Sequence, residues 1–506
     1  MPAYKDKPVL GDLIAGVSVA LLLIPQSIAY ASLMGLPPIY GIYASILPPI
    51  AAAFFVSSPY LQTGPVAMTC LLSIGALSAV STPGAADYVG LAALLACLIG
   101  VCRLLIGMAH SGFIAYLMSP PLITGFTSGA AVLIISSQLP TFLGVEASGN
   151  GITMKALSVI SQPGNWSLPT IILGVLSIII IVGGKKIHTL FPGILIAVIV
   201  GIIFSHLFAY QGHVIGALPA GLPTLSLDLP WHRSLDLLVP AIVVALVGFA
   251  EPASIARTIA TQNRESWSVD REFISQGMAN IASGISGCFP VGGSFSRTII
   301  SFKAGGKTRW SGAITGLSVL ACLPVMWILE PLPKTVLAAI IISAVFTLID
   351  VKGLYRIVCD SKPQGFIACT TFILTILLSP RVDIAILIGI ALSVAIHLWR
   401  EKSLEIKSEF KNETLTLHPH GVLFFGSVPT LGDVLRNALA HHIHTRKLIL
   451  DLSHVGRIDY TGVVTLKRLM LDAEQSGLEV KIIPGGTERS LFLLKHVLGK
   501  NSQWFD

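Results

Sequence analysis

Long apolar runs are the feature that most limits what this chain can fold into. Stretches such as "GILIAVIVGIIFSHLFA" at 193–209 are apolar on every face of a helix, whereas a helix of a water-soluble protein keeps one polar face. Similar runs recur from Leu10 to about Trp399, and 53% of the 506 residues are hydrophobic. The sequence therefore predicts a polytopic α-helical membrane protein whose solvent is the lipid bilayer.

Hydrophobic windows separated by turn residues and charges predict about fourteen membrane segments. Their approximate ranges are 10–32, 40–57, 65–80, 88–109, 120–143, 168–183, 190–209, 236–257, 270–288, 294–304, 310–329, 334–350, 364–379 and 382–400. The segment that begins at Ser294 has about ten residues, which at 1.5 Å per residue cover about half of a hydrocarbon core roughly 30 Å thick. It is therefore predicted to be a half-helix.

Basic residues are unevenly shared between alternate loops. One set of loops and both ends of the membrane region carry most of them, whereas the other set carries Lys155, Arg233, Lys334 and Arg381. The positive-inside rule then places the N- and C-termini in the cytoplasm, which agrees with an even number of crossings. Because the cations are dispersed over short loops, the net charge of +7 does not indicate a nucleic-acid surface.

The composition changes to a polar, alternating pattern after Arg400. We predict a transmembrane domain at 1–400 and a small cytoplasmic α/β domain at 401–506. Within the second domain, residues 448–452 and 480–483 are predicted strands and 461–475 a helix, with Gly477 near its end.

Catalytic and metal-binding patterns are not evident in the sequence. The seven cysteines lie in or beside apolar runs without paired spacing, which argues against a disulfide framework or a metal site. The chain has no recognisable Ser/His/Asp constellation and no phosphate-loop motif. We therefore expect neither an enzyme nor a cofactor.

The two halves of the membrane region share a weak internal repeat, at about 10–209 and 236–400. "LIPQSIAYA" (23–31) is followed about forty residues later by "QTGPVAMTCLL", and "FAEPASIAR" (249–257) is followed at a similar distance by "VGGSFSRTII". Each half thus combines a proline-interrupted helix with a later glycine that opens a short helix. This layout is typical of transporters built from inverted repeats.

Short helices at 65–71 and 294–301 would start near the bilayer midplane and face one another across a cavity. Their free N–H groups and positive dipole ends would stabilise an anion there. Gly64 and Gly293 would allow close backbone approach, Ser294 would be the N-cap, and Ser296 and Arg297 would add donors. An intramembrane arginine costs roughly 2.5 to 3.5 kcal/mol on translocon scales, which suggests that it has a use.

Structural explanations compete with these roles. Arg297 could pair with a carboxylate or extend to an interface, and Glu251 could form an ion pair with Arg297 or Arg257. The functional alternative for Glu251 is a proton-accepting site. Gln26, Ser27 and Tyr30 could serve as polar contacts between helices.

Three motifs resemble one known family. "LIPQSIAYASLMGLPPIYGIYASILPPIAAAFF" with "TGPVAM", and "GGSFSRTIISFKAGGKT", resemble the two signatures of the sulfate permease (SulP) family of anion transporters. The C-terminal "LILDLSHVGRIDYTGVVTL" resembles the STAS domain. The short N-terminus and compact C-terminal domain are more similar to bacterial members, which implies a multi-pass protein of the cell inner (plasma) membrane.

The resemblance implies seven plus seven inverted transmembrane segments, divided into a core and a gate domain that move by elevator-like alternating access. It also implies a homodimer and a STAS domain able to bind cytoplasmic regulators. Thr461 keeps a hydroxyl where stand-alone STAS proteins are phosphorylated, although Tyr460 replaces one serine of that motif.

The resemblance further implies which residues form the site. The substrate-binding residues would be Gln26, Tyr30, Pro65, Val66, Ala67, Ser294, Phe295, Ser296 and Arg297. Glu251 would be the coupling-ion residue, for H⁺ or Na⁺.

We therefore predict secondary active transport of a small anion of the sulfate, bicarbonate or dicarboxylate class, by proton- or sodium-coupled symport. An uncoupled exchanger or channel of the same family is the main alternative. A neutral-solute permease and a membrane-anchored sensor are further alternatives, against which Arg297 and the polar midplane residues argue.

Overall fold

The computed structural model describes residues 9–149, 151–188, 191–208, 210–219, 221–401, 404–499 and 504–505. It divides into two compact units, residues 1–391 and 392–506. The helices of the membrane region are α1 (Leu10–Leu33), α2 (Ile39–Tyr43), α3 (Leu47–Phe55), α4 (Ala67–Leu77), α5 (Tyr88–Met108), α6 (Pro120–Leu143), α7 (Ile152–Ile160), α8 (Leu168–Ile178), α9 (Gly184–Ile187), α10 (Gly193–Leu207), α11 (Ser234–Asn263), α12 (Val269–Ile285), α13 (Phe295–Lys303), α14 (Trp310–Cys322), α15 (Lys334–Val345), α16 (Val351–Asp360), α17 (Lys362–Leu377) and α18 (Val382–Glu401).

Among the described residues, eight helical stretches are long and apolar enough to cross a membrane, and four further apolar helices are shorter. One of these four is α4, with 11 residues, and the separate helix α13 has 9. At 1.5 Å per residue these extend about 16 and 14 Å, roughly half of a hydrocarbon core. The half-helix prediction for residues 294–301 is thus confirmed in length, while the count of about fourteen spans stays a prediction.

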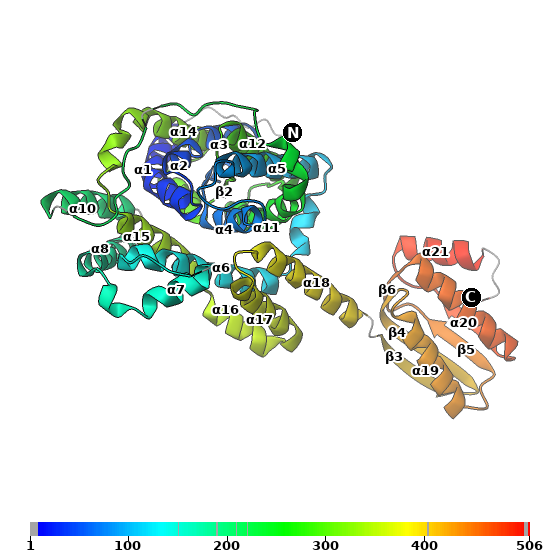
Figure 1. The fold of residues 1–506 in the computed structure, drawn as a ribbon. Coiled ribbons are helices and arrows are strands. Elements are labelled where there is room, and N and C mark those ends of the chain that lie inside the picture. Colours follow the sequence, from blue (N-terminus) through cyan, green and yellow to red (C-terminus); the bar gives the residue numbers. More distant parts are fainter. Residues whose placement is uncertain are drawn as a thin grey trace. The chain divides into compact units, whose positions relative to one another are not determined.

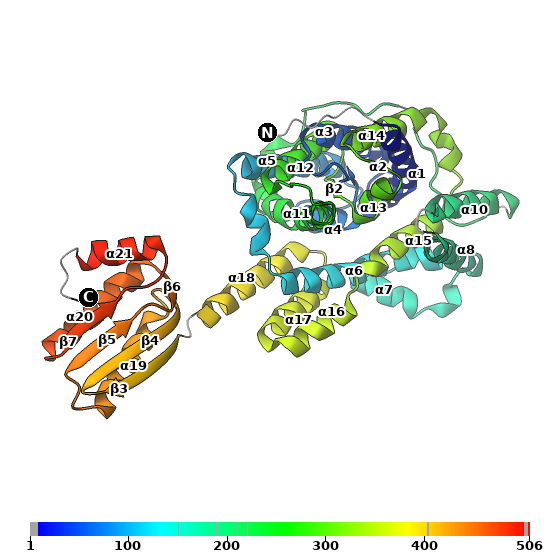
Figure 2. The ribbon, with the colours of Figure 1, turned by 180° about the vertical axis from the view of Figure 1, so that it is seen from behind.

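The helices of the membrane unit form two packed groups (Figure 1, Figure 2). In the first group, α5 packs against α11 and α12, while α14 packs against α1 and α3. In the two halves of the chain, α5 corresponds to α14, α11 to α1, and α12 to α3. Each half therefore makes the same contacts with the other half, as an inverted repeat requires. In the second group, α6 packs against α15 and α17, and α8 packs against α15.

A two-stranded antiparallel pair connects the two halves inside the first group. Strands β1 (Thr63–Gly64) and β2 (Gly292–Gly293) pair with Thr63 opposite Gly293 and Gly64 opposite Gly292. In both views β2 lies among the helices of this group (Figure 1, Figure 2). Backbone of this kind is tolerated at membrane depth when surrounding protein buries it, and all four residues are buried.

The C-terminal unit contains a five-stranded sheet with helices α19 (Val428–His441), α20 (Tyr460–Gln475) and α21 (Glu488–Leu498). The strands are β3 (Glu405–Lys411), β4 (Thr414–Leu423), β5 (Lys447–Asp451), β6 (Val455–Ile458) and β7 (Glu479–Ile483). The order is β3-β4-β5-β7, with β6 also paired to β4, and only β3–β4 is antiparallel. Alternate residues of β5, Leu448 and Leu450, are fully buried in its core, as expected for a half-buried strand.

Apart from shifted ends, such as that of α11 at Asn263 instead of 257, the structure differs from the sequence-based ranges in three places. The predicted segment 40–57 is two helices, α2 and α3, separated around Ser45, where two prolines at the start of α3 favour a new helix over a continued one. Two short helices, α7 and α16, were not predicted. Both are amphipathic or mostly exposed, so a search for uniformly apolar windows passes over them.

Candidate functional site

The β1–β2 pair brings the starts of α4 and α13 together. Two residues separate β1 from α4, which begins at Ala67. Only Ser294 separates β2 from α13, which begins at Phe295. The first N–H groups of a helix have no partner within the helix, so two sets of free donors and two positive dipole ends lie in one region. This is the arrangement predicted from the sequence, although the cavity expected between the two helix starts stays a prediction.

Arg297 lies on the first turn of α13 and is 1% exposed. Its Nη1 donates to the carbonyl oxygen of Pro65 at 2.9 Å and to Oε1 of Gln26 at 3.4 Å. Among the residues that the structure describes, its Nε and Nη2 have no hydrogen-bond partner. A buried guanidinium with unpaired N–H groups is energetically costly, and an anion would supply the missing acceptors.

The carboxylate-pairing alternative for Arg297 can be compared with the described contacts. Neither Arg297 nor Arg257 is within ion-pair distance of Glu251 among the described ion pairs. The guanidinium carbon of Arg257 instead lies 5.6 Å from the centre of the Tyr116 ring. Glu251 is half-buried on α11 and is within electrostatic range of Arg297 and of the backbone N–H of Phe295.

The other predicted site residues lie around Arg297 on three elements. Gln26 and Tyr30 are one turn apart on α1 and buried, and Tyr30 is within electrostatic range of the guanidinium. Val66 and Ala67, at the start of α4, are also buried. On α13, Phe295 is 53% exposed, and Ser296 is exposed too.

Ser294 occupies the predicted N-cap position of α13, but its side chain does not cap the helix. Its hydroxyl is 3.4 Å from that of Ser296, and its N–H donates to the carbonyl oxygen of Gln62 at 3.0 Å. Its own carbonyl accepts from the Thr298 hydroxyl at 2.6 Å. Ser294 therefore fixes the start of α13 through its backbone.

A set of polar residues that the sequence-based search missed supports the two strands. Gln276 donates to the hydroxyl of Thr63 at 2.9 Å. Asn280, one turn later on α12, donates to the carbonyl of Val291 and accepts from its N–H, both at 3.0 Å. Gln276 and Asn280 are four positions apart, so they lie on one face of the predicted segment 270–288. Two polar residues on one face of an apolar helix are a pattern from which a polar contact with a neighbouring segment could have been predicted.

Gln62 and Arg103 hold the same region from other sides. Nε2 of Gln62 donates to the hydroxyls of Ser301 and Ser311, both at 3.0 Å, and so ties β1 to α13 and α14. Arg103 is fully buried on α5 and donates to the carbonyls of Ala245 at 3.0 Å and Val291 at 3.3 Å. The strands and half-helices are therefore held by hydrogen bonds on several sides, which favours a fixed geometry.

Similarity to known proteins identifies the family of the chain. The profile of the sulfate permease family matches residues 9–371, most of the chain. The chain belongs to the sulfate permease family. The STAS domain matches residues 405–486, which lie within the C-terminal unit described above.

Named relatives of this sulfate permease are transporters. Probable sulfate transporter 4.2 of Arabidopsis thaliana is 30% identical over 539 residues, which cover 98% of this chain and 79% of that protein. A probable sulfate transporter of Mycobacterium tuberculosis is 31% identical over 77% of this chain and 70% of its own length. The permease is accordingly an anion transporter of a membrane, not an enzyme.

Two solved structures share the fold of the permease. The anion transporter SLC26A9 superposes with a TM-score of 0.88 at 21% identity, covering 98% of this chain and 88% of that one. The transmembrane domain of a cyanobacterium bicarbonate transporter, BicA, superposes with a TM-score of 0.67 at 24% identity, covering 74% of this chain and 96% of that one. The predicted fold class, a membrane transporter domain followed by a STAS domain, is confirmed.

The remaining predicted residue of the permease is Thr461. It is exposed and lies in the first turn of α20, where the helix is capped by the Asp459 carboxylate, which accepts from the N–H of Gly462. Among the described residues, no group of three or more His, Cys, Asp or Glu side chains is arranged to hold a metal ion.

Proposed function

We propose that this permease binds a small oxyanion between the starts of α4 and α13 and carries it across the membrane by elevator-like alternating access. The observation that supports the proposal most is the buried Arg297, whose Nε and Nη2 have no hydrogen-bond partner in the described part of the chain. The proposed ligands are Arg297 itself and the first N–H groups of the two helices at Val66, Ala67 and Ser296, whereas the N–H of Phe295 interacts with the Glu251 carboxylate.

Gln26, Tyr30 and Pro65 would position the guanidinium rather than compete with the anion. Gln26 and Pro65 both accept from the same nitrogen, Nη1, so Nε and Nη2 stay free for the substrate. Ser294 would hold the start of α13 through its bond to Gln62. The proposed substrate class is sulfate or bicarbonate, because the named relatives are sulfate transporters and one structure of the same fold is a bicarbonate transporter. The uptake experiment below also includes a dicarboxylate.

Glu251 is the proposed coupling residue for H⁺ or Na⁺ symport. Its carboxyl lies within electrostatic range of both Arg297 and the start of α13, so a change in its charge alters the field in which the anion binds. Because the two groups are not an ion pair within 4 Å among the described contacts, Glu251 is available to a proton or cation.

The assembly is proposed to be a homodimer in the inner membrane, with both termini in the cytoplasm and the STAS domain binding regulators. Exposed Thr461 is the proposed regulatory position, because a phosphate in the first turn of α20 would be stabilised by the helix dipole. Cross-linking of the purified protein and mass spectrometry of Thr461 test these two proposals directly.

Uptake by proteoliposomes tests the transport proposal. Labelled sulfate, bicarbonate and fumarate are each offered with and without an inward proton or sodium gradient, to the wild type and to Glu251→Gln. The matched control is Glu146→Gln, which changes an exposed carboxylate. Accumulation of one anion that requires a gradient and Glu251 supports symport. Flux that depends on neither the proton nor the sodium gradient, and that is equal in all three proteins, contradicts symport and favours an exchanger or channel.

A further inference from the structure

Two cavities lie side by side, one within the second helix group and one between that group and α1 of the first group, and they share two residues. The wide cavity has a volume of about 790 Å³ and is walled by parts of α6, α8, α10, α15 and the loop at 210–213. The narrow cavity has a volume of about 150 Å³ and lies between α1, α6 and α15. Thr141 and Lys334 line both. The two cavities are therefore neighbours that meet at these side chains.

The narrow cavity is lined by residues of α1 that follow Gln26, a residue of the proposed anion site. On α1 it is lined by Ala29, Ser32 and Leu33. Gln26, which accepts from Arg297, is three positions before Ala29 and seven before Leu33, and such positions share one face of a helix. The cavity thus lies on the face of α1 that carries Gln26, about one helical turn away. Since a water molecule occupies about 30 Å³ of liquid, the narrow cavity has room for one small anion with a few waters.

Lys334 is held at the junction by its backbone. It is the first residue of α15, and its N–H donates to the carbonyl of His213 at 2.8 Å. The same loop is fixed by a bridge between Val214 and Pro333 and by a bond from the N–H of Ile215 to the carbonyl of Leu332, at 3.0 Å. The loop and the start of α15 are therefore one connected piece, which fixes the position of the Lys334 backbone.

No described carboxylate compensates the charge at the junction. Lys334 is half-buried, and it takes part in none of the described ion pairs or side-chain hydrogen bonds. No aspartate or glutamate is among the described residues that line either cavity. The nearby Glu330 accepts instead from the N–H of Leu218 at 3.0 Å. A half-buried ammonium with no carboxylate beside it attracts an anion.

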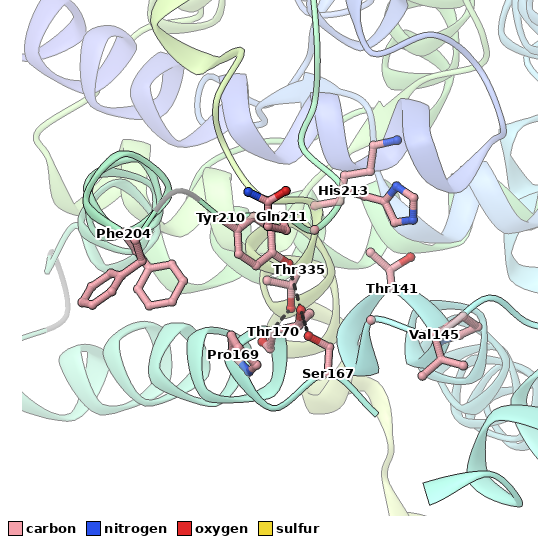
Figure 3. Close-up of a pocket in the computed structure, with 15 residues that line it drawn as sticks. Thr141, Val145, Ser167, Pro169, Thr170, Phe204, Tyr210, Gln211, His213 and Thr335 are labelled. Atoms are coloured by element: carbon pink, nitrogen blue, oxygen red, sulfur yellow. Dashed lines mark hydrogen bonds between the residues drawn. The ribbon is translucent and has the colours of Figure 1, made fainter. Parts of the chain in front are cut away.

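The wall of the wide cavity is rich in hydroxyl groups. The hydroxyls of Ser167 and Thr170 are 2.8 Å apart, and that of Thr170 is 2.9 Å from the phenol of Tyr210. Figure 3 shows this chain of three hydroxyls in the middle of the view, with Phe204 to its left. A lining of this kind keeps water in the cavity, so a hydrated anion can enter it.

We propose that the wide and narrow cavities form an access route for the transported anion, and that Lys334 is an anion-binding residue at the point where they meet. The proposal rests on the proposed function, because the route leads to Arg297. It places the entrance on the face with few basic residues, which the positive-inside rule predicts to be the outer one. The ligand class is the same small oxyanion, bound in transit before it reaches the helix starts.

Substitution of Lys334 tests the route. For whichever of the three labelled anions the wild type transports, Lys334→Gln is expected to raise the outer KM about fivefold, the effect of one charge a few ångström from the anion in water. The kcat stays unchanged, because binding at Arg297 is intact. Lys334→Arg keeps the wild-type KM. The matched control is Lys155→Gln, which removes an exposed charge from the same predicted face but lines neither cavity.

Chemical restoration of the charge separates a role in anion binding from a role in folding. In Lys334→Cys, 2-aminoethyl methanethiosulfonate adds a positive group, and the 2-sulfonatoethyl reagent adds a negative one. The first is expected to lower the KM toward the wild-type value and the second to raise it further. Wild-type protein treated with both reagents controls for its seven native cysteines.

The outcomes separate this inference from the proposed function. If Arg297→Ala loses uptake while Lys334→Gln behaves like Lys155→Gln, the site stands and the route is wrong. Equal effects of the two reagents would also overturn the role of Lys334. If Arg297→Ala transports normally, the proposed function itself fails, whatever Lys334 does.

Discussion

Nη1 of Arg297 donates a hydrogen bond to the carbonyl oxygen of Pro65 at 2.9 Å, across 232 positions of the chain. The bond joins the start of the short helix in one half to the start of its counterpart in the other. It also directs the guanidinium so that Nε and Nη2 have no hydrogen-bond partner among the described residues. The anion site that we propose depends on this relationship, and the predictions below test what maintains it.

Gly293 has no room for a side chain. A Cβ there would lie 2.8 Å from Cδ1 of Leu61 and 3.1 Å from Cβ of Pro252, so an alanine must displace the Leu61 side chain and press β2 against Pro252. We expect Gly293→Ala to lower stability by about 1–3 kcal/mol, as overpacking does, and to reduce uptake severalfold. Thermal unfolding and proteoliposome uptake measure the two effects. Gly183→Ala, where a Cβ meets nothing within 4 Å, is the control; equal stability and uptake in both variants would refute this explanation.

Asn280 is expected to be needed for the position of β2. Asn280→Leu leaves the buried N–H of Val291 without its acceptor, which costs about 1–3 kcal/mol. Asn280→Asp keeps an acceptor for that N–H and should fall between the leucine variant and the wild type. Chemical or thermal unfolding gives the order of stability. A leucine variant as stable as the wild type would show that Asn280 does not hold the strand.

Glu251 is expected to control coupling but not binding. Glu251→Gln keeps the size of the side chain but removes its ability to carry a negative charge or to bind a proton. Gradient-driven accumulation should therefore disappear, while exchange of internal for external anion continues. The paired measurement is net uptake under a gradient and exchange without one, in the same vesicles. Loss of both activities would make Glu251 structural, and retention of both would remove it from the coupling mechanism.

Asp451 is expected to stabilise the STAS domain only above acidic pH. Burial opposes its ionisation, but bonds from the N–H of Ser453 at 2.9 Å and with the His418 ring at 3.0 Å outweigh burial and lower its pKa below the usual value. A carboxyl with a lowered folded-state pKa contributes stability above its unfolded pKa, about 3.9, and loses it as pH falls through the lower folded value.

Asp451→Asn should therefore lower the melting temperature of the STAS domain at pH 6 and lose this difference toward pH 3. Melting of the full-length protein over that range measures it, and exposed Asp472→Asn is the control. A difference between Asp451→Asn and wild type that does not change with pH would contradict the assignment.

Much of the fold could be predicted because its signals are local. Uniformly apolar runs mark α6 and α18 within a residue of their ends, and the short apolar run at 448–452 indicates the buried strand found as β5. The short helix at α13 was predictable because a glycine pair precedes it and "GGK" follows it within about half a membrane thickness.

The supports of the site could not be predicted in the same way. The register that sets Thr63 opposite Gly293 joins residues far apart in the chain, and no local pattern specifies it. The same holds for Arg103, whose guanidinium donates to the backbone carbonyl of Ala245 on α11 and to that of Val291, next to β2. Backbone carbonyls carry no sequence signature, so a buried arginine of this kind is recognisable only after folding.

Direct anion binding to the purified protein is the most direct test of the site. Isothermal titration of the transported anion compares the wild type with Arg297→Ala and Arg297→Lys, with exposed Arg468→Ala as the control. We predict that the alanine variant weakens binding at least tenfold, about 1.4 kcal/mol, since bonds to a charged group contribute about 1.5–3 kcal/mol each. The lysine variant should be intermediate, because it keeps the charge but not the planar set of donors. Equal affinity in the wild type and Arg297→Ala would contradict an anion site at the start of α13.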